Sequence, residues 1–294
     1  MILRYATRVW TIALVGACTQ TLDAGHNKAA ELCSNRDAGA TKCLPTGLLD
    51  NLVGYWRLDD GVGSTVAYDS SGRGNEGLLH DLDPKTAWVP GRSDGALAIS
   101  HGGWVQVAPS ASIDSIADRI TVTAWVNRES TTGTSDTWGT ALSRQVGTTN
   151  DQHYHIALFY DGHPTLFIST VNGYKMLAGG DVVAMGVWTH LAGVYDGKII
   201  RLFVNGIEVD SKALTGAFRA DTTAVVLGGN GNDSSGIPTE LFPGRIDELM
   251  LYARALSAAE IGQLAVGSLF RVASADAGLD GSMSGEKLPD DAAR

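Results

Sequence analysis

The sequence predicts an all-β protein, an antiparallel sandwich or barrel that occupies most of the chain. Short β-prone runs recur along it, Gly, Asp, Asn and Ser turn residues separate them, and no long helical pattern intervenes. Many short strands joined by tight turns are typical of antiparallel sandwiches and barrels. A chain of 294 residues accommodates one such large domain together with flanking segments.

The N-terminal segment is predicted to be an export signal. Two arginines precede the mostly apolar run 9–17, which is too short to cross a bilayer. The ending Val15-Gly16-Ala17-Cys18 resembles the bacterial lipobox, in which the cysteine is lipidated and becomes the mature N-terminus. We therefore expect a lipoprotein signal peptide over residues 1–17 and lipidation of Cys18. The alternative is an ordinary signal peptide that happens to end near a cysteine, with the protein secreted.

Export determines the expectation for the other cysteines. If Cys18 is acylated, Cys33 and Cys43 remain in an oxidising compartment, and two cysteines allow one pairing. Their spacing is not that of a zinc site. We expect a disulfide between Cys33 and Cys43, with two free thiols as the alternative.

The flanking segments differ in composition from the central domain. Residues 18–46 are polar and are predicted to form a tether, and residues 267–294 are rich in Ala, Gly, Ser and Asp and are predicted to be a disordered tail. The domain between them is expected over residues 47–266. A net charge of -10, without any Lys/Arg cluster, argues against nucleic acid as a partner. No stretch beyond the signal is long and apolar enough to span a membrane, so membrane contact is expected through the lipid only.

The β-prone runs follow one another through the central domain. Strands are expected at 53–58, 103–107, 120–126, 155–160, 165–169, 188–195, 199–204, 224–227 and 245–252. In the run 120–126 the apolar residues alternate with Thr121, Thr123 and Trp125, which predicts two different faces.

Local signals predict the connections. Asp-Gly or Asn-Gly pairs within 160–163, 195–198 and 204–207 predict tight hairpins. The capping box from Ser257 to Glu260, followed by Ile261 and Leu264 at helical spacing, predicts one short helix.

These runs also carry family motifs. Their order resembles that of a LamG-like jellyroll domain of the concanavalin A-like lectin/glucanase superfamily, over about 50–265, with a core repeat at about 118–257. The motifs are Gly54–Gly61, Asp69–Gly77, Gly95–Ile99, Ile120–Val126, Trp188–Gly197, Leu202–Gly206, Gly244–Leu249 and Arg254–Ile261. The resemblance implies a two-sheet antiparallel jellyroll sandwich. It also implies a binding function, because relatives bind carbohydrates, matrix proteins or cell-surface partners, often with calcium.

The loop from Asp69 to Asn75 is the candidate calcium site. Its oxygen side chains and glycine-rich backbone suit a hard cation. Similar family members place calcium between such a loop and an acidic residue near the last strand, so the resemblance implies Asp69, Asn75 and Asp247 as ligands, with Glu248 in place of Asp247 as the alternative. The usual Asp after a strand like 96–100 is missing, because His101 stands there. The other reading of the loop is a turn in which Asp69 caps its own backbone.

Two aromatic residues are candidate ligand-binding groups. Trp138 and Tyr174 stand in polar, loop-like stretches, where an exposed ring can stack on a sugar face. The alternative for each is a partly buried loop anchor. The tryptophans within the predicted strands are expected in the core; they are Trp56, Trp104, Trp125 and Trp188.

Three sequence patterns could indicate catalysis, but each lacks the neighbouring element or residue that the chemistry requires. The G-x-S-x-G match at 91–95 precedes a predicted strand, whereas a nucleophile elbow requires a helix there. His153 and His155 lack a third zinc ligand. Glycoside hydrolysis needs two facing carboxylates, but Asp247 and Glu248 are neighbours that should point to opposite faces of a strand.

Glucanases of the superfamily that the chain resembles carry two Glu residues and an Asp on one strand, and this motif is incomplete here. The sequence Glu208-Val209-Asp210 starts such a motif, but its second Glu is absent.

The sequence therefore predicts a non-catalytic binding or adhesion module. We expect it on the bacterial cell envelope, with a glycan or a cell-surface protein as ligand and calcium as the candidate cofactor. The alternatives are a structural envelope protein without a small ligand, or a glycoside hydrolase or lyase.

Overall fold

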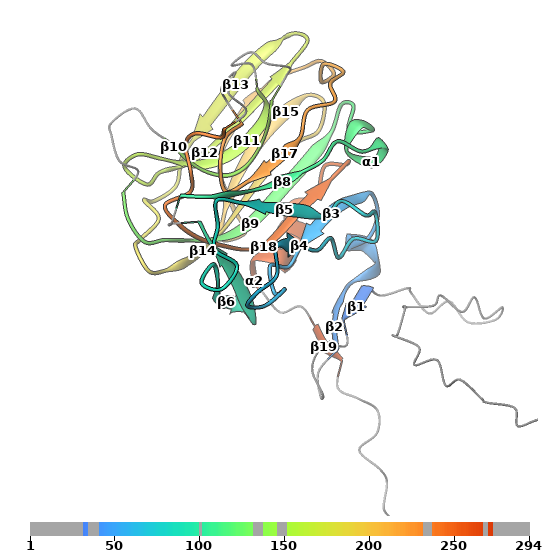
Figure 1. Cartoon of the computed structure of the whole chain (residues 1–294). Coiled ribbons are helices and arrows are strands. Elements are labelled where there is room, and N and C mark those ends of the chain that lie inside the picture. Colours follow the sequence, from blue (N-terminus) through green and yellow to red (C-terminus); the bar gives the residue numbers. More distant parts are fainter. Residues whose placement is uncertain are drawn as a thin grey trace, which may run out of the picture. The chain divides into compact units, whose positions relative to one another are not determined.

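The predicted all-β fold is confirmed by the computed structural model, which describes residues 32–34, 41–99, 102–131, 138–145, 152–231, 237–266 and 270–272. These residues belong to one compact unit, Glu31–Arg294. The signal peptide and Cys18 lie outside the described residues. Two antiparallel sheets of eight strands each form the domain (Figure 1). No helix among the described residues is long and apolar enough to cross a membrane.

The first sheet, called here the β11 sheet, has the order β13-β12-β11-β10-β17-β8-β5-β4. Its strands are β4 (Val66–Ala67), β5 (Gly77–His80), β8 (Trp104–Val107), β10 (Trp138–Gln145), β11 (Gln152–Phe159), β12 (Pro164–Thr170), β13 (Gly173–Ala178) and β17 (Val225–Leu227). Strand β13 lies at one edge and the two-residue β4 at the other.

The second sheet, called here the β9 sheet, has the order β16-β15-β14-β9-β18-β7-β6, and β3 also pairs with β18. Its strands are β3 (Leu52–Trp56), β6 (Trp88–Ser93), β7 (Gly95–Ala98), β9 (Ile120–Arg128), β14 (Trp188–Tyr195), β15 (Ile199–Val204), β16 (Ile207–Ala213) and β18 (Gly244–Tyr252). Strands from distant parts of the chain therefore lie side by side, which is the connectivity that the jellyroll resemblance implies.

The main core lies between the two sheets. Val122, Ala124 and Val126 of β9 pack in one apolar cluster with Ile156 and Leu158 of β11, as the alternation along each strand predicts. The sheets approach closely at Gly193 of β14, where a Cβ atom would lie 2.4 Å from Leu166 of β12. A larger residue there would force the Leu166 side chain to shift within the core.

A second apolar cluster covers part of the outer face of the β9 sheet. The 3-10 helix η1 (Thr46–Leu48) and the helix α2 (Ala258–Val266) contribute to it. Its members are Leu44, Leu48, Leu52, Tyr55, Ala192, Val194, Phe203, Met250, Tyr252, Leu256, Ile261 and Leu264. This second layer explains why both faces of β9 are buried. Leu44, three residues before the predicted domain boundary at residue 47, also packs in this cluster.

The predicted connections are confirmed. The Asn205-Gly206 turn between β15 and β16 has positive φ at both residues, as a type I′ hairpin requires. The capping box forms reciprocally, because the backbone N–H of Ser257 donates to Glu260 and that of Glu260 donates to the Ser257 hydroxyl. One further helix of a single turn, α1 (Ala111–Asp114), was not predicted.

The predicted tether and tail contain short strands. β1 (Leu32–Ser34), β2 (Thr41–Leu44) and β19 (Phe270–Val272) form a three-stranded sheet. These short strands lie in segments without a clear hydrophobic alternation, so the sequence does not predict them. Cys33 lies directly opposite Cys43 in the β1–β2 pair. Opposed antiparallel residues have Cα atoms about 4.5–5.5 Å apart, which suits a disulfide, and the bond itself stays a prediction.

Candidate functional site

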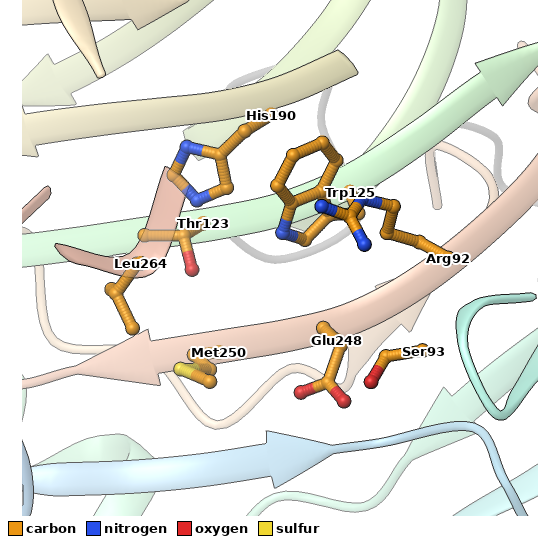
Figure 2. Close-up of a pocket in the computed structure, with 8 residues that line it drawn as sticks. All are labelled: Arg92, Ser93, Thr123, Trp125, His190, Glu248, Met250 and Leu264. Carbon is orange, nitrogen blue, oxygen red and sulfur yellow. The ribbon is translucent and has the colours of Figure 1, made fainter. Parts of the chain in front are cut away.

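A pocket opens on the outer face of the β9 sheet, next to the second apolar cluster (Figure 2). Its cavity volume is only about 20 Å³, because most of the space that it frames is open to solvent. It is lined by Arg92, Ser93, Thr123, Trp125, His190, Glu248, Met250 and Leu264. These residues come from β6, β9, β14, β18 and α2, so the site exists only in the folded domain.

Strand alternation forms one wall of the pocket. Thr123 and Trp125 occupy the face of β9 that points away from the main core. His190 of β14 lies directly opposite Trp125, and the centroids of their rings are 5.4 Å apart. The indole and the imidazole therefore stand next to each other on the outer face.

A β-bulge in β18 forms the floor. Asp247 lies opposite Trp125 and Met250 lies opposite Thr123, so β18 contains one extra residue over this stretch. Glu248 sits in the bulge with a φ of 49°, in the left-handed region that non-glycine residues rarely adopt. The prediction that Asp247 and Glu248 point to opposite faces is therefore wrong. Asp247 shares the outer face with Trp125, and Glu248 lines the pocket.

Asp247 ties the turn between β6 and β7 to the floor. Its Oδ2 accepts hydrogen bonds from the backbone N–H groups of Arg92, at 2.8 Å, and Ser93, at 3.0 Å. The residue is 0% exposed, and its Oδ1 has no hydrogen-bond partner among the described residues. Burial, followed by the nearby charge of Glu248, raises the pKa of Asp247 to about 8. Deprotonation of Asp247 therefore occurs just above neutral pH.

Glu248 is held by a neighbour on β3. Its Oε2 accepts a hydrogen bond from the Tyr55 hydroxyl, and the residue is only 5% exposed. Burial and the charge of Glu248 raise the pKa of Tyr55 well above its usual range, so the phenol remains a donor. The bulge and this hydrogen bond together keep an acidic side chain in place at the pocket floor.

Arg92 supplies the cation of the site. Its guanidinium carbon lies 4.7 Å from the centroid of the Trp125 ring, which is a cation–π contact. Burial lowers the pKa of His190 to about 3, so its imidazole is neutral at physiological pH, and its Nδ1 has no partner among the described residues. The pocket is thus lined by an aromatic ring, a guanidinium, a carboxylate and a neutral imidazole.

The predicted calcium residues are only partly brought together. Asp69 Oδ1 accepts hydrogen bonds from the backbone N–H groups of Tyr55 and Ser71, and its Oδ2 accepts from the Ser71 hydroxyl and the Asn75 backbone N–H. This is the self-capping turn that was the alternative for the loop. Asp247 bonds to the β6 turn instead.

Asn75 is equally engaged in the protein interior. Its amide nitrogen donates to the Val53 carbonyl and the Ser112 hydroxyl, and its Oδ1 accepts from the Ser110 hydroxyl. Within the described ranges, no group of three or more His, Cys, Asp or Glu side chains is arranged to hold a metal ion. Calcium binding by Asp69, Asn75 and Asp247 stays a prediction that these contacts do not support.

The two predicted ligand-binding aromatics share the outer face of the β11 sheet. Trp138 contacts His155 at 5.3 Å between centroids, His155 stacks on Phe167 at 5.9 Å, and Phe167 stacks on Tyr174 at 5.2 Å. We call these four residues the ring row. Tyr174, on the edge strand β13, is 65% exposed, whereas the inner rings are covered by one another. A ligand role for Trp138 and Tyr174 stays a prediction.

The other catalytic patterns remain without a catalytic context. Residues 91–95 connect β6 to β7, so no helix follows the G-x-S-x-G match. His153 and His155 are buried on β11, and burial lowers the pKa of each to about 4, so both are neutral at physiological pH. Glu208 is exposed on the edge strand β16 and pairs with Arg201.

Sequence reasoning missed the pocket residues. Trp125 is buried, as the sequence predicts, but it lies beside the pocket on the outer face of β9, and its position among Thr121 and Thr123 on the polar side of the strand is a usable signal for that face. Arg92 and Glu248 carried no such signal, because their positions depend on a turn that folds over β18 and on an irregularity within β18.

Solved structures with related folds come from several kinds of protein. Domain 4 of an extracellular arabinanase from Geobacillus stearothermophilus, solved with arabinotriose, is 22% identical with a TM-score of 0.54, and the match covers 73% of this chain and 98% of that domain. The binding domain of a paraclostridial mosquitocidal protein is 20% identical with a TM-score of 0.56, over 74% of this chain and 52% of the other.

A sialidase from Trypanosoma rangeli is 15% identical with a TM-score of 0.56, over 77% of this chain and 34% of the enzyme. At such identities these similarities establish the fold alone.

Sequence comparison identifies the family. No curated protein sequence matches the chain. Residues 100–262, more than half of the chain, match the family described as the concanavalin A-like lectin/glucanases superfamily. This match overlaps the predicted core repeat and includes the strands β9, β14 and β18 that form most of the pocket. The chain belongs to the concanavalin A-like lectin/glucanase superfamily.

Proposed function

We propose that the chain is a non-catalytic carbohydrate-binding module and that a sugar residue binds at the mouth of its pocket on the β9 sheet. The observation that carries the proposal is the convergence of Trp125, Arg92 and Glu248. Sugars present an apolar ring face and a belt of hydroxyl groups, which match an aromatic side chain flanked by charged donors and acceptors. The remaining wall supplies a neutral imidazole from His190.

The arrangement of carboxylates supports binding without hydrolysis. A glycosidase places two carboxyl groups on either side of the scissile bond, about 5–10 Å apart. Here Glu248 lines the pocket, whereas Asp247 is 0% exposed and its Oδ2 is engaged by two backbone N–H groups. Glu248 is the one acidic residue in the lining of the pocket, which supports a role in holding a sugar hydroxyl group.

A saccharide panel followed by titration tests the binding function. We expect wild-type protein to bind at least one class of saccharide, and Arg92→Ala to weaken that binding by about tenfold or more, since a charge-assisted hydrogen bond is lost. Arg201→Ala is the matched control, because Arg201 pairs with Asp196 at 2.7 Å and does not line the pocket. The absence of binding across the whole panel would favour a protein partner instead.

We also propose that the module is exported and displayed on the bacterial cell envelope through a lipid on Cys18. The lipobox-like ending of the apolar run supports this proposal. Growth with a clickable fatty acid should label the wild-type protein in the membrane fraction. The Cys18→Ala variant should lose both the label and the membrane association, and an equally labelled Cys18→Ala protein would contradict lipidation at this residue.

A further inference from the structure

The loop between β13 and β14 presents apolar side chains to solvent. Its residues 182–187 have the sequence Val-Val-Ala-Met-Gly-Val, which contains no polar side chain. Val182, Met185 and Val187 are 42%, 50% and 53% exposed, respectively. Loops are usually rich in polar residues, and exposed apolar side chains that are grouped together mark interaction sites, whereas isolated ones do not. This loop is therefore a candidate contact surface.

The body of the domain holds the loop in position. The Val183 side chain is 3% exposed and packs in the main core. The backbone N–H of Val183 donates to the Gly162 carbonyl at 3.0 Å, and that of Gly186 donates to the Arg128 carbonyl at 2.8 Å. A surface that is ordered before binding loses less conformational entropy than a flexible loop does. The exposed apolar side chains are therefore presented on a fixed backbone.

The turn between β11 and β12 adds an aromatic ring to this surface. Tyr160 is 37% exposed, and the turn is joined to the loop through the hydrogen bond to Gly162. The exposed apolar residues of the two segments form what we call the apolar tip, which consists of Tyr160, Val182, Met185 and Val187.

The charges that flank the apolar tip are acidic. Asp161 and Asp181 are both exposed. The backbone N–H of His163 donates to Asp161 and lowers the pKa of this carboxyl group, and His163 Nδ1 lies 2.9 Å from Asp161 Oδ2. Neither 160–163 nor 181–187 contains a Lys or an Arg. The surface is therefore apolar at its centre and negative at its border.

We propose that the apolar tip is a docking surface for a protein segment that is apolar at its centre and rich in Lys and Arg at its border. The apolar side chains of the partner pack on Met185 and the two valines, and the unbranched methionine adapts to their shape. Its Lys and Arg side chains pair with Asp161 and Asp181, which sets the orientation of the complex. The surface is separate from the pocket on the β9 sheet, because none of its residues lines that pocket.

Two other occupants fit the charges less well. Segments that lie in a bilayer interface usually carry Lys and Arg on their polar side, whereas the apolar tip is flanked by Asp161 and Asp181. A second copy of the chain would bring the same two carboxylates toward their equivalents, and like charges that face each other oppose association. The acidic border therefore favours a basic protein segment over both.

Titration of the full chain with two designed helical peptides tests the proposal. One peptide combines Leu with Lys, and the other has Glu in place of every Lys. We expect the Leu/Lys peptide to bind, with an affinity that falls as the salt concentration rises, and the Leu/Glu peptide not to bind. Equal binding of the two peptides, or no binding of the Leu/Lys peptide, would overturn the proposal.

Two variants locate the binding at the apolar tip. Met185→Ser should weaken binding of the Leu/Lys peptide by about five- to tenfold, since a large apolar contact is lost. Leu78→Ser is the matched control, because Leu78 is 56% exposed on β5 and does not belong to the tip, and it should bind the peptide as the wild type does. Equal affinities of the two variants would show that the peptide binds elsewhere on the acidic surface.

The other occupants are tested with the same variant. The Cys18→Ala chain, which carries no lipid, should neither bind phosphatidylcholine vesicles in a flotation assay nor form dimers in sedimentation velocity. Vesicle binding that Met185→Ser abolishes would overturn the proposal in favour of a bilayer. A dimer that Met185→Ser dissociates would overturn it in favour of a second copy.

Discussion

The two outer faces of the sandwich use aromatic side chains in different ways. On the β11 sheet the four residues of the ring row fill the space beside one another, and Tyr174 is the ring that remains largely exposed. On the β9 sheet Trp125 faces a pocket, because a bulge and a turn bring Glu248 and Arg92 beside it. The difference indicates that an aromatic ring on a sheet face lines a pocket where an irregular backbone brings charged groups to it.

The largest expected effect concerns the buried carboxyl group beneath the pocket. The folded state raises the pKa of Asp247 to about 8, above its value of about 4 in the unfolded chain. Its protonation therefore contributes stability that is fully present below pH 4 and is lost as the pH rises to about 8. Between these values the free energy of unfolding should fall by up to ~1.4 kcal/mol per pH unit from this group.

Denaturant unfolding from pH 5 to 9 measures this effect. The Asp247→Asn variant keeps an acceptor for the N–H groups of Arg92 and Ser93 but does not titrate, so its stability should vary less with pH. Parallel curves for the wild type and the variant would show that Asp247 is already ionised at low pH.

The turn at Asp69 is expected to affect stability but not binding. Asp69→Ala removes the acceptor of four hydrogen bonds and should lower the free energy of unfolding by about 1–3 kcal/mol. Asp83→Ala is the control, since Asp83 is exposed and caps its turn through the Lys85 N–H. The loss should be the same with calcium and with a chelator. A chelator that lowers the wild-type Tm but leaves that of Asp69→Ala unchanged would instead support the calcium site.

The bulged carboxylate is expected to matter for binding more than for stability. Glu248→Gln retains an acceptor for the Tyr55 hydroxyl but loses its charge. Saccharide affinity should fall about five- to tenfold, because a hydrogen bond to a charged group becomes a neutral one. Calorimetric titration measures the change in affinity. An unaltered affinity would show that the Glu248 carboxylate does not contact the saccharide.

The fold was predictable because its signals are local and repeated. The Asn205-Gly206 turn and the alternation in β9 each require only a few neighbouring residues, and both are present as expected. The capping box at Ser257 is equally local. The order of the family motifs then determined which sandwich these elements form.

The candidate site was less predictable because its signals are not local. Period-two alternation placed Asp247 and Glu248 on opposite faces, and the bulge cancels that rule. Asp69 carries a carboxylate suited to calcium, yet its hydrogen bonds to Tyr55, Ser71 and Asn75 become visible only once β3 lies beside the loop. The residue type indicates what a carboxylate can bind, but its neighbours in the folded structure determine which groups it contacts.

The smallest effect is expected in the ring row. Tyr174→Ala removes an exposed ring at the edge of the β11 sheet and should change saccharide affinity by less than about twofold, since mutations outside an interface are near neutral. The same titration measures it. A large loss of affinity would show instead that the saccharide binds on the outer face that Trp138 and Tyr174 share.

The most direct test compares two tryptophans that are equally buried on opposite outer faces. Trp125 is 8% exposed in the pocket, and Trp104 is 7% exposed on β8, where it stacks on His80 at 5.3 Å. Titration with the best saccharide of the panel should show at least about a tenfold loss of affinity for Trp125→Ala and wild-type affinity for Trp104→Ala. Equal affinities for the two variants, both folded, would contradict the assignment of the pocket as the carbohydrate site.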